Sequence, residues 1–197
     1  MKTVVFSFGR MNPVTIGHER LVAKVAAEAK KARATPMVFL SQSQDKKKNP
    51  LSYEDKIRFA RTAFGSIVVK SEAKTIIDVL KALSKYDNVI MVVGSDRVAN
   101  FKSMLERYNG VEYNFKSITV ISAGERDPDS DDVSGMSASK MRALAADNNL
   151  SAFKKGLPTK LQRSAKEVMR AVRLGMGLQE RREQYLWNLI RERFRQK

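Results

Sequence analysis

The chain opens with Thr3-Val4-Val5-Phe6-Ser7-Phe8-Gly9-Arg10-Met11-Asn12-Pro13-Val14-Thr15-Ile16-Gly17-His18, and this stretch decides the fold. Residues 3–8 are mainly apolar, as in a parallel strand covered on both faces, and a helical pattern begins around His18. A strand, a turn and a helix N-terminus together predict an anion site, because the helix end presents unpaired N–H groups and the positive end of its dipole. Gly9 and Gly17 have no Cβ and let a ligand approach the backbone. His18 is the only histidine of the chain.

Strands and helices alternate through the rest of the first 147 residues. We predict strands at 36–40, 67–69, 89–93 and 118–121, and helices at 53–64, 75–86 and near 95–107. This alternation predicts an α/β fold, a Rossmann-like doubly wound parallel sheet. Ligands bind such sheets beyond the carboxyl ends of the strands, so we expect the opening motif and the segments after Ser41, Gly94 and Ser122 to converge on one crevice.

The composition excludes several classes of protein. A chain of 197 residues with 43% hydrophobic content can bury one core. No apolar run approaches the roughly 18 residues that span a bilayer, so we expect no membrane partner. The absence of cysteine excludes disulfides and thiolate catalysis, and a single histidine argues against a zinc site, so we expect no metal held by the protein. The first strand leaves no room for a secretory signal, and we expect a cytoplasmic protein.

Positive charge is concentrated towards the C-terminus. The net charge is +16, and residues 146–197 hold 13 Lys and Arg against 5 Asp and Glu. We predict a catalytic domain over residues 1–150 and a basic helical extension over 151–197, with 156–158 as the plausible boundary. The extension carries cations along one helical face and then an apolar stripe: Lys160, Arg163, Lys166, Arg170 and Arg173, then Tyr185, Leu186, Trp187, Leu189, Ile190 and Phe194. Such a stripe favours packing on the body of the protein, a homo-oligomer or another protein assembly, and the charge favours nucleic acid.

A second polar constellation lies more than a hundred residues after the first. In Ser134-Gly135-Met136-Ser137-Ala138-Ser139-Lys140-Met141-Arg142, either Ser137 or Ser139 can cap the helix that follows. Arg142 lies one turn after Ser139 on the same face and can reach the same anion.

Both constellations resemble motifs of the nucleotidyltransferase superfamily, whose members transfer a nucleoside monophosphate from a nucleoside triphosphate. Thr15-x-Gly17-His18 is similar to the signature (H/T)-x-G-H, with threonine where many members have a first histidine. Residues 136–142 are similar to I-S-S-T-x-x-R, which grips the β- and γ-phosphates; Met136, Ala138 and Ser139 replace Ile, the second Ser and Thr. The resemblance implies a nucleotidyltransferase-type fold and transfer without a covalent intermediate.

The resemblance also implies roles for particular residues. His18 would donate to the α-phosphate, while Thr15, Ser139 and Arg142 would hold the β- and γ-phosphates. Magnesium would arrive on the triphosphate. Lys46–Lys48 follow the second strand and are expected to neutralise the departing pyrophosphate, with a solvated loop or an acceptor site as alternatives. We therefore predict His18, Arg142 and Lys47 as catalytic residues. The predicted nucleotide-binding residues are Gly9, Arg10, Met11, Asn12, Thr15, Gly17, His18, Gly94, Asp96, Ser137, Ser139 and Arg142.

The acceptor is inferred from the opening motif. Gly9-Arg10-x-Asn12-Pro13 resembles the nicotinamide-nucleotide adenylyltransferase branch more than the pantetheine or cytidylyl branches. The chain also resembles adenylyltransferase-like proteins encoded by bacteriophages, which would place it in host cytoplasm or a virion. We expect transfer of AMP from ATP to nicotinamide mononucleotide, and hence a part in NAD biosynthesis. The alternatives are a cytidylyltransferase, or a virion-associated or nucleic-acid-binding module that retains the scaffold.

Overall fold

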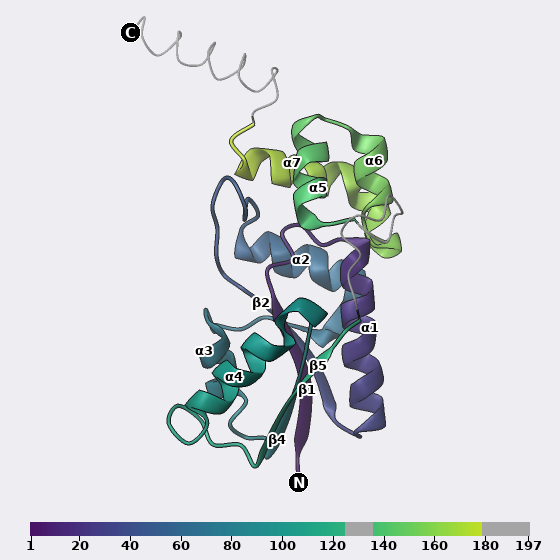
Figure 1. Cartoon of the computed structure of the whole chain (residues 1–197). Helices are drawn as coiled ribbons and strands as arrows, with labels where there is room; N and C mark the ends of the chain where they lie inside the picture. The colour runs from purple at the N-terminus through teal and green to yellow at the C-terminus, as the bar shows by residue number, and fades with distance from the viewer. Residues whose placement is uncertain (125–135, 179–197) are drawn as a thin grey trace, which may run out of the picture.

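A parallel sheet of five strands forms the centre of the computed structural model, which describes residues 1–124 and 136–178. The strand order is β3-β2-β1-β4-β5 and every pairing is parallel. The strands are β1 (Thr3–Gly9), β2 (Thr35–Leu40), β3 (Val68–Val69), β4 (Asn88–Val93) and β5 (Ser117–Ser122). The predicted doubly wound α/β fold is confirmed (Figure 1).

Both faces of the sheet are covered, which explains why its strands are apolar without alternation. The helices are α1 (Ile16–Lys31), α2 (Tyr53–Phe64), α3 (Ile76–Ala82) and α4 (Val98–Tyr108). On one face Val5, Val38 and Val92 pack with α1 and α2. On the other face Phe6 and Met91 pack with α3 and α4. Figure 1 shows the two helix pairs on opposite sides of the sheet.

Some elements are shorter than their apolar patterns predict. The helix predicted over 75–86 ends at Ala82, because the chain turns at Leu83 and the Tyr86 N–H donates to the Leu83 carbonyl at 2.9 Å. The third strand loses Ile67 to the 3₁₀ turn η1 (Gly65–Ile67). The helix predicted near 95–107 begins with the 3₁₀ turn η2 (Ser95–Arg97) before α4.

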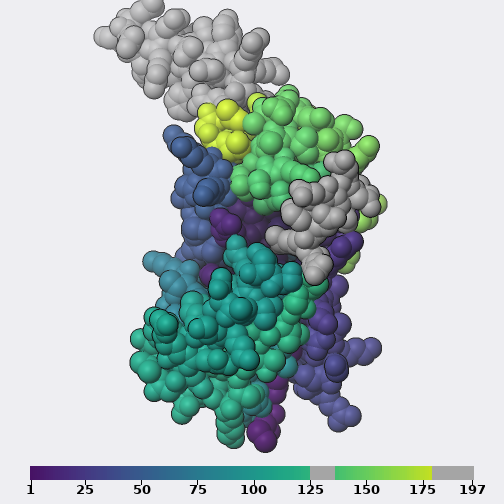
Figure 2. Space-filling view, in the orientation of Figure 1, coloured from purple at the N-terminus to yellow at the C-terminus, as the bar shows by residue number. Residues whose placement is uncertain are grey.

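Residues 136–178 form a helical unit that packs on α1 and α2. Its elements are α5 (Ala138–Ala146), α6 (Leu150–Lys155), the 3₁₀ helix η4 (Thr159–Ser164) and α7 (Ala165–Gly175). Phe153, Leu161, Val168 and Val172 are fully buried in the same core cluster as α1 and α2. Figure 2 shows this unit, in green to yellow, beside the blue loop that follows β2.

Close backbone contacts join the helical unit to the rest of the molecule. The Ile16 N–H at the start of α1 donates to the Gly156 carbonyl at 2.9 Å. A Cβ on Gly175 would collide with the Pro50 carbonyl oxygen and lie 2.5 Å from the carbonyl carbon, so only glycine fits there. The boundary predicted at residue 150 stays a prediction, and the apolar stripe at 185–194 lies outside the described residues. Among residues 1–124 and 136–178, no helix is long and apolar enough to cross a membrane.

Candidate active site

The sheet opens between β1 and β4, where the winding of the fold reverses. The pairing of β1 with β4 stops at Phe6 and Met91. From there the backbone continues for three residues on each side, from Phe6 to Gly9 and from Met91 to Gly94. On its other edge β1 stays paired with β2 up to Gly9 and Leu40. A Cβ on Gly9 would meet no atom within 4 Å, so the space above this residue is open. This is the place where doubly wound sheets bind ligands.

Thr15 and His18 are hydrogen-bonded to each other at the start of α1. Thr15 is the N-cap and is buried, and its backbone N–H donates to His18 Nδ1 at 3.0 Å. The Thr15 hydroxyl lies 3.0 Å from the same nitrogen. Because Nδ1 accepts the backbone hydrogen bond, the neutral ring carries its proton on Nε2. Thr15 therefore orients the histidine; contact between its hydroxyl and a phosphate stays a prediction.

Asn12 of the opening motif is hydrogen-bonded both to the backbone of Leu51 and to Arg142 of α5. Its buried side chain pairs with the Leu51 backbone: Oδ1 accepts from the Leu51 N–H at 3.0 Å, and Nδ2 donates to the Leu51 carbonyl at 3.4 Å. Its own carbonyl accepts from Arg142 Nη1 at 2.8 Å. Asn12 thus acts as a structural anchor through its side chain. The contact with Arg142 joins motifs that are 130 residues apart in sequence.

Arg142 and Arg10 lie within electrostatic range of each other. Partial burial lowers the pKa of the Arg142 guanidinium, and the charge of Arg10 lowers it further, while the Asp45 carboxylate opposes both effects. An anion bound near both guanidinium groups would relieve this repulsion and could accept hydrogen bonds from either.

The segment before α5 places two serine hydroxyls at a helix N-terminus, where anions often bind. Ser137 is the N-cap, and its Oγ accepts from the Lys140 N–H at 3.1 Å. Its hydroxyl also lies 3.3 Å from that of Ser139, which is exposed. Ser137 is thus occupied by capping, which leaves Ser139 as the more accessible of the two hydroxyls.

Asp45 organises the basic loop, residues 44–50. Its carboxylate accepts from the backbone N–H of Lys47 at 2.9 Å, that of Lys48 at 2.6 Å, and Asn49 Nδ2 at 2.5 Å. These donors, led by the Lys48 N–H, hold the pKa of Asp45 at about 2. The side chains of Lys46, Lys47 and Lys48 are exposed on the turn that Asp45 closes. Asp45 was not selected from the sequence, although an aspartate four residues before an asparagine is typical of such a turn.

Lys56 is the second residue that sequence reasoning missed. It lies on the buried face of α2, is fully buried, and donates from Nζ to the Ser41 carbonyl and, at 3.1 Å, to the Ser43 carbonyl. Burial lowers the pKa of its amine to about 8. The Ser41 N–H donates to the Gly9 carbonyl at 2.9 Å, so Lys56 supports the backbone next to the crevice. A lysine one position before Ile57 on the apolar face was the available signal.

Three further predicted nucleotide-binding residues are Gly94, Asp96 and Met11. Gly94 caps η2, and Asp96 is exposed and paired with Arg97 at 3.8 Å. Met11 is buried with a φ of 42°. Among the described residues, no group of three or more His, Cys, Asp or Glu could hold a metal ion. The acidic run at 127–132 lies outside the described residues.

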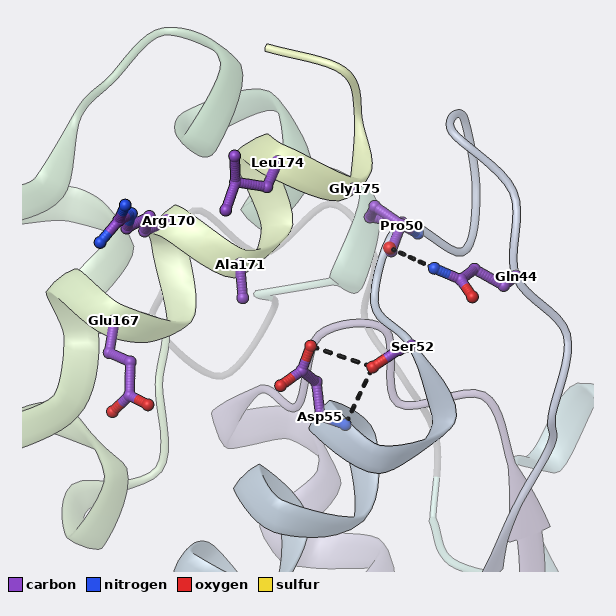
Figure 3. Close-up of a pocket in the computed structure, with 9 residues that line it drawn as sticks. All are labelled: Gln44, Pro50, Ser52, Asp55, Glu167, Arg170, Ala171, Leu174 and Gly175. Carbon is purple, nitrogen blue, oxygen red and sulfur yellow. Dashed lines mark hydrogen bonds between the residues drawn. The ribbon is translucent and has the colours of Figure 1, made fainter. Parts of the chain in front are cut away.

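A shallow cavity of about 360 Å³ separates α7 from the basic loop (Figure 3). It is lined by Gln44, Pro50, Ser52, Asp55, Glu167, Arg170, Ala171, Leu174 and Gly175. The carboxylates here are engaged: Asp55 bonds Ser52 at 3.0 Å and Arg58 at 2.8 Å, and Glu167 pairs with Arg58. This cavity contains none of the predicted catalytic residues.

The fold is that of a nucleotidyltransferase-type domain. The chain belongs to the cytidylyltransferase-like family, whose sequence model matches residues 6–144.

Two crystal structures of Thermotoga maritima TmcAL are similar to this chain. The apo form I has a TM-score of 0.55 at 15% identity and the form bound to alpha-thio ATP has 0.50 at 12%; each covers 89% of this chain. At such identities the likeness shows the fold alone. The chain spans 58% and 57% of the two TmcAL chains. No curated protein matches the chain significantly.

Proposed function

We propose that this protein transfers AMP from ATP to a phosphorylated acceptor, with nicotinamide mononucleotide as the best candidate, and releases pyrophosphate. One observation carries the proposal: Arg142 Nη1 donates to the Asn12 carbonyl at 2.8 Å. This contact joins the two motifs that resemble triphosphate-binding signatures, as a shared triphosphate site requires. The charge of Arg10 also lowers the pKa of Arg142, which adds positive potential for a phosphate.

The proposed reaction is a single displacement. A phosphate oxygen of the acceptor attacks the α-phosphorus, the new P–O bond forms, and the bond to the bridging oxygen breaks as pyrophosphate leaves. Catalysis then depends on positioning and on stabilising charge, which needs no nucleophilic side chain. Arg142, Arg10 and Ser139 would hold the β- and γ-phosphates, and Lys47 would meet the departing pyrophosphate.

His18 would donate from Nε2 to a nonbridging oxygen of the α-phosphate. The hydrogen bond from the Thr15 N–H to Nδ1 supports this role, because it leaves the proton on the other ring nitrogen. The Ile16 N–H, also at the start of α1, bonds the Gly156 carbonyl and is therefore not open to a phosphate.

Magnesium, in this proposal, arrives on the triphosphate and neutralises charge on its phosphates. The Asp45 carboxylate is close enough to Arg142 to oppose the lowering of its pKa, but it already accepts three hydrogen bonds. It is better suited to shaping the basic loop than to holding a cation.

The choice of AMP and of the acceptor has separate support. TmcAL, which shares the fold, has been crystallised with an ATP analogue. Nicotinamide mononucleotide and a part in NAD biosynthesis rest on the resemblance of Gly9-Arg10-x-Asn12-Pro13, and a bacteriophage origin rests on the overall likeness of the sequence. Transfer of CMP from CTP is the second candidate, favoured by the family match.

The test is pyrophosphate release from ATP or CTP against a panel of phosphorylated acceptors. We expect release with ATP and nicotinamide mononucleotide, and little without an acceptor. Arg142→Gln should abolish most of it, while Arg107→Gln, on the exposed surface of α4, removes the same charge and should change nothing. No release with any triphosphate, from protein shown to be folded, contradicts an enzyme. Release with CTP alone favours the second candidate.

A further inference from the structure

The helical unit carries positive charge that its own residues do not neutralise. Residues 136–178 contain 9 Lys and Arg against 2 Asp and Glu. One of those acids, Glu167, pairs with Arg58 of α2. We propose that five cations of this unit, the basic patch (Lys154, Lys155, Lys160, Arg163 and Lys166), bind the phosphate backbone of nucleic acid. This binding is independent of the proposed transfer reaction, because none of the five belongs to the active site.

The local structure places these cations on the outside of the unit. In a 3₁₀ helix residues three apart lie one above the other, so Lys160 and Arg163 share one side of η4, and Lys166 follows after three more residues. The opposite side is buried through Leu161, Ala165 and Val168. Lys154 and Lys155 end α6, three residues before η4. All five side chains are exposed.

The basic patch lies in a part of the chain that is denser in positive charge than the first 124 residues. Those 124 residues contain 21 Lys and Arg against 11 Asp and Glu, and six of these cations meet a carboxylate, as in Lys24–Glu28, Lys70–Glu54 and Lys116–Asp87, at 2.8 to 3.0 Å. Within the described parts of the chain, no ion pair is formed by any member of the basic patch. Exposed cations without a carboxylate partner attract the regular negative charge of a phosphate backbone.

The composition of the basic patch favours nucleic acid over a protein partner. Protein interfaces are centred on buried aromatic and aliphatic anchors. The large apolar side chains exposed on the helical unit are Leu150, Leu174 and Leu178, none of which separates members of the patch in sequence. Phe153, the aromatic residue next to Lys154, is fully buried and cannot stack on a base. We therefore expect contact with phosphates alone, without sequence preference.

The experiment measures binding of the full chain to a 20-base-pair DNA duplex as a function of KCl concentration. The test variant replaces all five members of the basic patch by Gln. If each neutralises one phosphate, the slope of log Kobs against log[KCl] becomes less negative by about 4.5, at roughly 0.9 per phosphate. A change of about 3 or more is the expected result. A second duplex of scrambled sequence should bind equally.

The matched control removes the same charge from the other half of the molecule. It replaces Lys30, Lys31, Lys74, Lys102 and Arg107, all exposed, by Gln. The control should keep the wild-type slope. Equal slope changes in both variants would mean that binding follows net charge, and this result would overturn the proposal. Absence of wild-type binding at 50 mM KCl would also overturn it. Patch-dependent binding to vesicles of 30% phosphatidylserine without DNA binding would overturn it in favour of a membrane. Circular dichroism confirms folding of both variants.

Discussion

Lys56 allows a direct test of the structure, because burial of its amine changes the pKa and therefore the pH dependence of stability. The side chain is fully buried and donates to two backbone carbonyls, those of Ser41 and Ser43. Burial lowers its pKa from the ordinary 10.5 to about 8. The perturbation is Lys56→Met, which keeps the length and the apolar stem of the side chain and removes the charge.

The sign and size of the effect follow from proton linkage. Between pH 8 and 10.5 the unfolded chain still holds the lysine proton while the folded protein has released it, so the unfolded state binds more protons and stability rises with pH. From pH 7 to pH 10 this group should add about 2.5 kcal/mol to the free energy of unfolding, at roughly 1.4 kcal/mol for each pKa unit. Other lysines and tyrosines titrate in both proteins and cancel in the difference.

The assay is urea unfolding of wild type and Lys56→Met at pH 7, 8, 9 and 10. The wild-type free energy minus that of the variant should rise by about 2.5 kcal/mol over this range. A difference that stays flat within about 0.5 kcal/mol would refute the burial of the amine. If the variant does not fold, NMR titration of the wild-type Lys56 side chain gives its pKa directly, and a value near 10.5 refutes the reasoning equally.

Three further substitutions test the site, and a fourth, Gly175→Ala, tests the packing of the helical unit. His18→Ala should lower turnover by about 10²–10³ with circular dichroism unchanged, since one preorganised donor to a developing charge is worth roughly that, and unaltered turnover would remove its catalytic role. Arg142→Ala should raise the apparent Michaelis constant for the triphosphate more than that for the acceptor, and steady-state kinetics with each substrate varied would show the reverse if the assignment is wrong. Gly175→Ala should lower the free energy of unfolding by about 1–3 kcal/mol in urea, because its Cβ meets the Pro50 backbone. Gly9→Ala adds a Cβ that meets nothing within 4 Å, so it should leave the free energy of unfolding unchanged. It should weaken triphosphate binding, measured by calorimetry, and unchanged binding would show that the ligand does not occupy the space above Gly9.

The fold was predictable because each strand and helix carries its own pattern. The unbroken apolar run at 89–93 became β4, covered on both faces, and the order of elements left few ways to wind a parallel sheet. The loss of the last residues of the helix predicted over 75–86 was not predictable, because the turn at Leu83 depends on backbone contacts that the apolar pattern does not encode.

The sequence predicted that the two motifs lie close together, but it did not predict the contacts within them; the roles of the site residues stay predictions. Sequence order placed Arg142 with the opening motif, and the structure brings them to 2.8 Å. The pairing of the Asn12 side chain with the Leu51 backbone and the burial of Thr15 against His18 depend on tertiary geometry that no spacing rule contains. Lys56 was missed for the same reason, since a sequence gives the charge of a residue and not the dielectric around it.

The central position of β1 has a consequence for synthesis of the protein. Within this sequence β1 is synthesised before β2 and β4, between which it finally lies, and the Lys2 N–H donates to the Asp87 carboxylate at 2.7 Å. Residues 3–8 therefore expose an apolar strand with one open edge until residue 93 has been made, roughly 4 to 17 seconds later at 5 to 20 residues per second. During that interval the nascent chain presents the kind of edge that pairs with other chains. Yield at high expression should depend on the speed of translation through the codons for residues 9–93.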